Sequence, residues 1–130
     1  MSLRLFVAAD LAAGSLPLGK DQSHYLANVM RARAGDDVLV FNGRHGEWRG
    51  RLEAVGKNAV VVAIEAQSRA QAAEPDLWLL AAPIKKDRID LVAEKAAELG
   101  ASALWPVFTR RTVMSRVNTE RLSAHMVEAA

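Results

Sequence analysis

The 130-residue sequence contains no cysteine. Disulfide bonds, thiolate zinc sites and a cysteine nucleophile are therefore excluded. The three histidines, His24, His45 and His125, are far apart and lack the spacing of metal ligands. We expect no metal centre in this chain.

Long apolar runs are also missing, since no stretch approaches the roughly 18 residues that a transmembrane helix needs. Residues 1–13 include Arg4 and Asp10 and show no signal-peptide pattern. We therefore expect a cytoplasmic protein with no membrane partner.

Neither sign of charge prevails, because 17 basic residues face 15 acidic ones and the net charge is only +2. The content of 51% hydrophobic and 25% charged residues is typical of a packed globular protein. Twelve of the basic residues are arginines and five are lysines. This bias suits the recognition of phosphate or carboxylate, so the composition permits nucleic acid as a partner without requiring it.

The first half of the chain is predicted to be a small barrel. A first strand is expected over residues 3–8, followed by a loop through Gly14 and Gly19. Asp21 or Ser23 is expected to cap a short helix. The spacing of residues along this helix predicts two faces. Leu26, Val29 and Met30 are expected to face inward, and His24, Asn28 and Arg31 outward.

Three further strands are predicted over 38–41, 48–55 and 59–65, with turn signals at Asn42-Gly43 and at residues 56–58. The middle strand alternates regularly, which separates a core face from a solvent face. The core face comprises Trp48, Gly50, Leu52 and Ala54, and the solvent face comprises Glu47, Arg49, Arg51 and Glu53. These elements predict an antiparallel, partly closed barrel over residues 1–72.

Residues 67–75 are small and polar and end in proline, which places a domain boundary there. A strand over 77–82, a helix that begins at Asp87 or Asp90 and ends near Gly100, and a strand over 103–107 then predict the start of a parallel α/β domain, 76–130. Another helix begins near Asn118, and its inward residues are Leu122, Met126 and Ala129. A helix that stops at Ala130 after two strands of a parallel sheet predicts that the sequence is a fragment.

Basic residues follow both strands of the second half, at the sheet edge where ligands of open α/β folds lie. The first group is Lys85, Lys86 and Arg88, and the second is Arg110, Arg111 and Arg116. Because parallel strands end at one edge, the two groups are expected to converge on an anion; taken singly, each is also compatible with a solvated loop. In the first half, RNA contacts are expected from His24, Arg31, Arg49 and Arg51, the alternative being an ordinary exposed polar face.

The predicted helix of the second half has an inward stripe formed by Ile89, Val92, Ala93, Ala96 and Leu99. Leu91 falls on the opposite side, next to Lys95 and Glu98. Two interpretations remain open for that side. Lys95 and Glu98 form either an exposed i, i+3 ion pair or part of a face that another subunit or element covers.

The chain lacks a Ser-His-Asp set, paired acidic residues at a strand end and a glycine-rich nucleotide loop. The segment 42–46 lies between antiparallel strands, so it is expected to be a hairpin rather than a phosphate loop. From the residues alone, the chain is predicted to be an RNA or anion binder joined to an unfinished α/β domain.

Several segments, taken in order, resemble the ribosomal RNA small subunit methyltransferase E family. In the first half they are His24-Tyr25-Leu26, Val29-Met30-Arg31, Gly35-Asp36 and Phe41-Asn42-Gly43. In the second half they are Lys86-Asp87-Arg88, Glu94-Lys95, Glu98-Leu99-Gly100, Pro106 and Arg111-Thr112-Val113. The resemblance covers nearly the whole chain.

The resemblance implies a PUA-like RNA-binding barrel followed by a SPOUT domain with a C-terminal trefoil knot. It implies a homodimer that transfers a methyl group from S-adenosylmethionine to N3 of a uridine in small-subunit ribosomal RNA. The family's cofactor loops are expected beyond residue 130, so no cofactor-binding residue is assigned in this chain, and the chain alone is expected to be inactive. Arg111 is the one candidate catalytic residue, with Lys95 and Glu98 at an interface. A different class of function, a stand-alone RNA-binding module with a non-catalytic α/β remnant, stays open.

Overall fold

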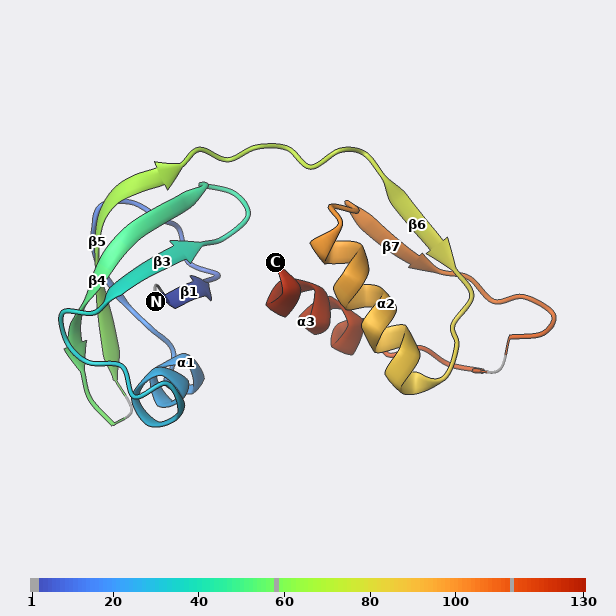
Figure 1. The fold of residues 1–130 in the computed structure, drawn as a ribbon, viewed down its shortest axis with the longest axis horizontal. Coiled ribbons are helices and arrows are strands. Elements are labelled where there is room, and N and C mark those ends of the chain that lie inside the picture. Colours follow the sequence, from blue (N-terminus) through green and yellow to red (C-terminus); the bar gives the residue numbers. More distant parts are fainter. Residues whose placement is uncertain (1–2, 58, 113) are drawn as a thin grey trace. The chain divides into compact units, whose positions relative to one another are not determined.

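The computed structural model describes residues 3–57, 59–112 and 114–130, and the chain forms two compact units, Met1–Ala72 and Ala73–Ala130 (Figure 1). Asn58 of the predicted turn and Val113 of the arginine motif lie outside the described residues. Each unit has its own buried apolar cluster.

Unit 1 is built on a curved five-stranded sheet in the order β1-β3-β4-β5-β2 (Figure 1). The strands are β1 (Leu3–Phe6), β2 (Gly14–Pro17), β3 (Asp37–Phe41), β4 (Glu47–Val55) and β5 (Val60–Arg69). β3, β4 and β5 form the predicted antiparallel meander. The turn signals at Asn42-Gly43 and Gly56-Lys57 therefore identified the hairpins correctly.

The prediction of a purely antiparallel sheet was wrong, because β1 pairs with β3 in parallel, with Leu3 opposite Val38. The long connection between the two strands, which contains β2 and a helix, gives the chain room for the crossover that parallel pairing needs. β2, predicted as a loop, is an edge strand that pairs with β5. Pro17 is tolerated there because an edge strand leaves one side of its backbone unpaired.

The alternation of β4 holds over its first half and fails at Ala54. Gly50 and Leu52 are buried, whereas Ala54 is exposed because the register with β5 shifts between Leu52 and Ala54. A Cβ at Gly50 would lie 2.6 Å from the Ala63 carbonyl oxygen, so only glycine fits at that position. β5 also extends through Arg69, past the predicted boundary at residue 67, because Gln67 pairs with Trp48.

The helix of unit 1 begins as α1 (Lys20–His24) and continues as a π-helical turn, η1 (Tyr25–Val29). Neither Asp21 nor Ser23 is the cap, which is Gly19. Ser23 is buried instead, and its hydroxyl accepts a hydrogen bond from the Val60 amide at 3.1 Å. This bond fastens the helix to the start of β5.

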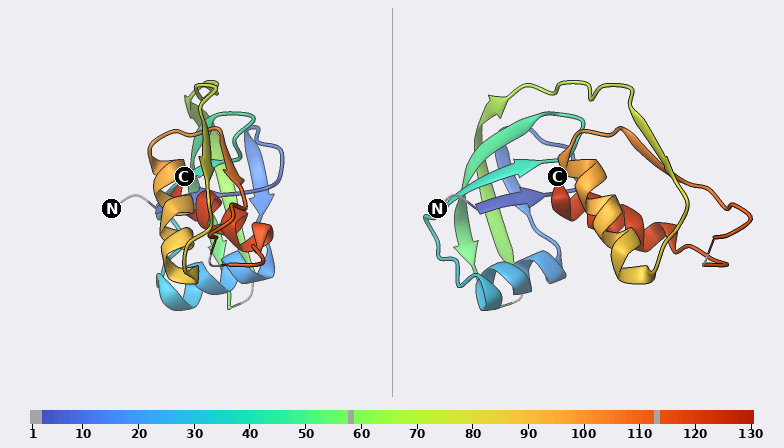
Figure 2. Two further views of the ribbon diagram at one scale, coloured as in Figure 1. Left: turned by 90° about the vertical axis from the view of Figure 1, so that its right-hand side faces the viewer. Right: turned by 45° about the vertical axis from the view of Figure 1, so that its right-hand side comes forward.

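Unit 2 contains the predicted strand–helix–strand arrangement. β6 (Trp78–Ala81) pairs in parallel with β7 (Ala103–Pro106), and α2 (Lys86–Glu98) connects them. Gly100, at φ 86°, ends α2, and Ala101 donates to the Ala96 carbonyl. The last helix, α3 (Thr119–Ala129), is capped by the Asn118 side chain and lies beside α2 (Figure 2).

The buried cluster of unit 2 lies between α2 and α3 and comprises Ile89, Ala93 and Leu122, with Leu104 packed against it. The inward placement of Leu99 was wrong, because α2 ends before it and its side chain is 83% exposed. The strand register places Trp78, Leu80 and Trp105 on the sheet face opposite Leu104, and all three are more than half exposed. One face of this small sheet is therefore apolar and uncovered within the unit.

In the described part of the chain, no helix is long and apolar enough to cross a membrane.

Candidate nucleic-acid interface

The predicted outward face of His24, Asn28 and Arg31 does not exist as one helix face. His24 is the last residue of α1, and Arg31 lies beyond the helical turn with a φ of 52°. Both side chains are exposed. The expected spacing fails because the chain leaves the α-helical path at Tyr25.

The π-turn is fixed at its ends by backbone hydrogen bonds and by a buried leucine. The Met30 amide donates to the Tyr25 carbonyl at 3.0 Å, and the Ala32 amide donates to the Leu26 carbonyl at 2.9 Å. Leu26 is fully buried. The wider turn carries Val29 and Met30 away from the core, so their predicted inward placement was wrong: Val29 is 61% exposed and Met30 is 36% exposed.

Arg49 and Arg51, the RNA-contact candidates of β4, differ in their surroundings. Both are exposed, but the Arg51 Nε lies 3.3 Å from an Asp37 carboxylate oxygen and 3.6 Å from one of Glu65. Arg51 is therefore already shared between two carboxylates on the sheet surface. Arg49 has no ion pair within the described residues, which leaves its guanidinium available to an outside anion.

Glu47, predicted to face solvent, instead joins a local cluster on the same sheet. Its carboxylate accepts a hydrogen bond from Arg4 Nε at 2.8 Å, and Arg4 also lies over the Phe41 ring at 3.9 Å from the centroid. The Arg4 hydrogen bond holds the pKa of the Glu47 carboxyl below its ordinary value, against the opposing effect of burial, with Ser68 assisting.

The segment between β3 and β4 is a hairpin, as predicted, and it is held by Asn42 and His45. Asn42 is buried, and its side-chain oxygen accepts hydrogen bonds from the amides of Arg44 and His45. Leu11 donates its amide hydrogen to His45 Nδ1 at 3.2 Å. These groups satisfy one another, so the loop has a structural role.

The basic residues of unit 2 follow the same edge of the small sheet. β6 and β7 run in the same direction, with Ala81 opposite Pro106, so the segments that follow the two strands both leave the sheet at that edge (Figure 1). Lys85, Lys86 and Arg88 lie at the start of α2, and Arg110, Arg111 and Arg116 lie in the segment after β7; all six are exposed. The common edge was correctly predicted, and their role in binding remains a prediction.

On the outer side of α2, Lys95 and Glu98 form an ion pair at 2.9 Å, with about half of the Lys95 side chain exposed. Glu98 raises the pKa of Lys95 by hydrogen bonding and by its charge. Leu91, on the same side, is 51% exposed. Within the described residues Glu98 pairs with Lys95, and no ion pair joins it to Arg111.

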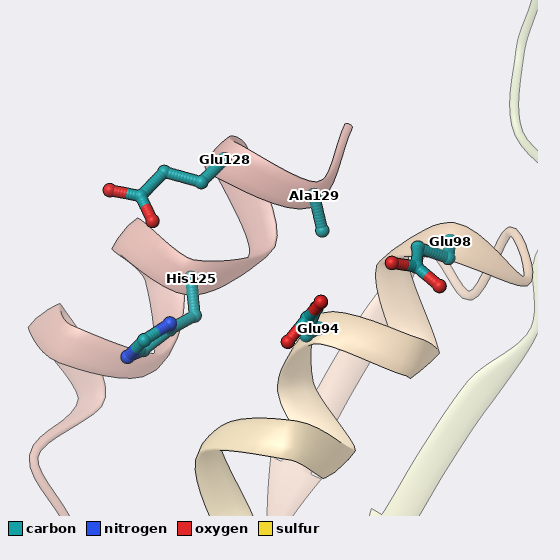
Figure 3. A pocket seen from close by; sticks show the side chains of 5 residues that line it. All are labelled: Glu94, Glu98, His125, Glu128 and Ala129. Carbon is teal, nitrogen blue, oxygen red and sulfur yellow. The ribbon is translucent and has the colours of Figure 1, made fainter.

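A shallow acidic hollow of about 310 Å³ lies between α2 and α3 (Figure 3). α2 contributes Glu94 and Glu98, and α3 contributes His125, Glu128 and Ala129. No group of acidic and histidine side chains in the described residues has the geometry of a metal site. Three carboxylates around the hollow would repel the phosphates of RNA.

Sequence reasoning missed that Tyr25 is a surface residue. It belongs to a motif of the first half, yet it is 47% exposed at the start of η1. One sequence signal could have indicated its exposure. The helix is short, so when Leu26 is buried, the adjacent Tyr25 must point away from the core.

Two family models match the chain, one in each unit. A model described as an RNA methyltransferase PUA domain matches residues 18–65, and a model described as an RNA methyltransferase domain matches residues 72–130.

Among curated proteins, the ribosomal RNA small subunit methyltransferase E of Rickettsia conorii is 32% identical over 128 residues, which is 97% of this chain and 52% of that protein. The same enzyme of Synechocystis is 29% identical over 133 residues and is covered to 44%. The chain thus spans about half the length of the curated relatives it matches.

Among solved structures, a ribosomal RNA small subunit methyltransferase E from Neisseria gonorrhoeae, bound to S-adenosyl methionine, has the same fold. The TM-score is 0.88 at 23% identity, and the match covers 99% of this chain and 55% of the other.

Proposed function

Because the chain belongs to the ribosomal RNA small subunit methyltransferase E family, we propose that it acts as part of an enzyme that methylates N3 of a uridine in small-subunit ribosomal RNA. S-adenosylmethionine would donate the methyl group, and the uridine would lose its N3 proton. We further propose a cytoplasmic homodimer as the working form.

One observation carries this proposal: two models that belong to RNA methyltransferases follow one another along the chain, the first within unit 1 and the second over the whole of unit 2. A stand-alone binding module accounts for the PUA match over 18–65. It does not account for the match over 72–130, which covers the strand–helix–strand of unit 2.

The hollow between α2 and α3 does not fit S-adenosylmethionine. Its adenosine needs a largely apolar cleft with a few polar groups, and its carboxylate needs a donor or a cation. The hollow between α2 and α3 is lined by three carboxylates, His125 and Ala129, so it offers little apolar surface and its acidic groups would repel the cofactor's carboxylate. We therefore place the cofactor site outside residues 1–130, in a knotted segment of the SPOUT type, and derive no step through the cofactor here. Calorimetry of the 130-residue chain with S-adenosylmethionine is expected to show no binding, and a micromolar dissociation constant would contradict this placement.

The residues of this chain are then proposed to hold RNA rather than to transfer the methyl group. A base can be methylated at N3 only when that edge is unpaired, so the enzyme must separate the target from its helix. The proposed RNA-contact residues are His24, Arg31, Arg49, Arg51, Lys85, Lys86, Arg88 and Arg111. All of them are exposed, and the arginines and lysines among them are positively charged, which supports this role. The face with Lys95 and Glu98 is proposed to be covered in the complete dimer.

The test is a methylation assay on small subunits that lack the modification. The protein from the complete reading frame is incubated with subunits and S-adenosylmethionine carrying a labelled methyl group, and the RNA is digested to nucleosides for mass spectrometry. We expect label in N3-methyluridine. Label in another nucleoside would overturn the N3 assignment, and tight RNA binding without any label would favour the stand-alone binding module.

A further inference from the structure

We propose that the turn formed by α1 and η1 is a binding site for one unpaired RNA nucleotide, in which the Tyr25 ring stacks on the base and Arg31 contacts the phosphate. The inference rests on the proposed function, because it takes RNA as the ligand. It adds a base-stacking residue that the family matches do not assign.

The first observation is an apolar strip on the outside of the turn. Tyr25 is 47% exposed, and Val29 and Met30 are also solvent-accessible. The Met30 amide bonds to the Tyr25 carbonyl, so these residues are one turn apart and adjacent on the surface. Leu26 anchors the same turn in the core, so the strip is held on a fixed support.

The second observation is the unfavourable backbone of Arg31. Its φ of 52° lies in the left-handed region, where glycine is the natural residue at a helix end. The Arg31 side chain is exposed and has no hydrogen bond or ion pair with the rest of the described chain. Because the Arg31 guanidinium has no partner within the described chain, it is available to an external anion.

The third observation is the charge around the strip. The Asn28 side chain donates to the Lys57 carbonyl at 3.5 Å, which keeps the β4–β5 turn beside η1. Arg33 and Lys57 are exposed and have no ion pair in the described structure, whereas Asp36 accepts a hydrogen bond from the Arg33 amide.

A flat exposed ring on a turn that also carries exposed cations matches an unpaired nucleotide, which presents a flat base on an anionic backbone. Duplex RNA fits less well, because its bases are stacked on one another and offer no free face. The chemistry therefore points to a single-stranded stretch or loop of RNA.

The single tyrosine of the chain makes a direct test possible. Fluorotyrosine incorporated into the 130-residue chain labels Tyr25 alone. We expect the fluorine resonance to shift when an unpaired RNA octamer is added and to stay in place when the same octamer is supplied as a duplex. An unchanged resonance at saturating unpaired RNA would overturn the proposal.

Substitutions test the two contacts separately. Tyr25→Leu is expected to weaken binding of the octamer about tenfold or more, whereas Tyr25→Phe, which keeps the ring, stays within about twofold. Arg31→Gln is expected to lower the slope of log affinity against log salt by about 0.7, the value for one contact to a single strand.

Arg69→Gln is the matched control, because it removes the same charge at the end of β5 farthest from the β4–β5 turn. It should leave the Tyr25 resonance shift intact. Unchanged unfolding midpoints would show that all variants fold. Affinity that is equal for wild type and Tyr25→Leu would overturn the stacking contact while the methylation assay stands. Tyr25-dependent RNA binding without N3-methyluridine would instead contradict the proposed function alone.

Discussion

At the scale of single residues, the pKa of Glu47 links the stability of unit 1 to pH. The Arg4 hydrogen bond lowers this pKa from its ordinary value of 4.5. A carboxyl with a lowered folded-state pKa adds stability at pH values above its unfolded pKa and loses it as the pH falls through the folded value. We predict that Glu47→Gln removes this part of the acid dependence below about pH 4.5. Denaturant unfolding at a series of pH values measures it, and parallel curves for both proteins would contradict it.

Arg31 provides a second prediction at this scale. The left-handed conformation destabilises the folded state by about 1 kcal/mol or more for any residue except glycine. Glycine avoids this strain, but it also loses more conformational entropy on folding, which offsets part of the gain. We expect Arg31→Gly to raise the free energy of unfolding by about 0.5 to 1 kcal/mol. Arg33→Gly, two residues away and without a positive φ, should lower it. Equal losses for both variants would show that the backbone of Arg31 is not strained.

Single buried residues were partly predictable from the sequence. Leu26, Leu52, Ile89 and Leu122 are buried as their spacing indicated. Ala54 is exposed because of a register shift that has no signature in the local pattern, and Leu99 is exposed because α2 ends before it. The buried hydroxyl of Ser23 depends on a strand 37 residues away, which no local reading supplies.

At the scale of elements, the contact between α2 and α3 depends on Asp90. Its carboxylate accepts a hydrogen bond from Arg121 Nε at 3.0 Å and lies 3.7 Å from His125 Nε2, and only 18% of the Asp90 side chain is exposed. We predict that Asp90→Asn destabilises unit 2 by about 1 to 3 kcal/mol, because it leaves Arg121 half-buried without a counter-charge. Denaturant unfolding is the measurement.

Glu128→Gln is the control for Asp90, since it removes the same charge from α3 at an exposed position. Its effect should stay within about 0.5 kcal/mol. Equal effects of the two substitutions would mean that the Asp90 ion pairs contribute nothing beyond net charge.

Elements with strong local signals were predicted well, and the others were not. The hairpins of β3, β4 and β5 and the α2 boundary at Gly100 follow from turn and cap residues. β2 and the parallel pairing of β1 depend on long-range partners, so the segment 14–17 was read as a loop. The π-turn escaped detection because α and π turns share the same residue preferences.

At the scale of the whole molecule, the outer side of α2 is where the proposed covering by another element or subunit can be tested. Here Glu98 pairs with Lys95 in solvent, beside the half-exposed Leu91. We predict that Glu98→Gln is nearly neutral in this chain but costs about 3 kcal/mol or more in the complete protein, where a covered charge would lose its partner. Denaturant unfolding of both lengths measures the difference. A nearly neutral effect at both lengths would leave Lys95 and Glu98 as a surface pair.

The positions of the proposed RNA-contact residues were predictable only in outline. Arginine bias and the basic groups after two parallel strands indicated an anion, and the common edge of β6 and β7 agrees with that. Arg51 already pairs with Asp37 and Glu65. Such internal pairings depend on side-chain positions across the sheet, which the sequence does not show. The prediction of methyl transfer rests on the family resemblance alone, because we identify no set of catalytic side chains among the described residues.

The most direct test of the central claim is the nucleoside composition of small-subunit ribosomal RNA from cells that lack the complete gene. Our account predicts that N3-methyluridine is present in the parent strain, disappears in the deletion strain and returns when the gene is restored. Full retention of N3-methyluridine in the deletion strain would contradict the assignment of this chain to a small-subunit uridine methyltransferase.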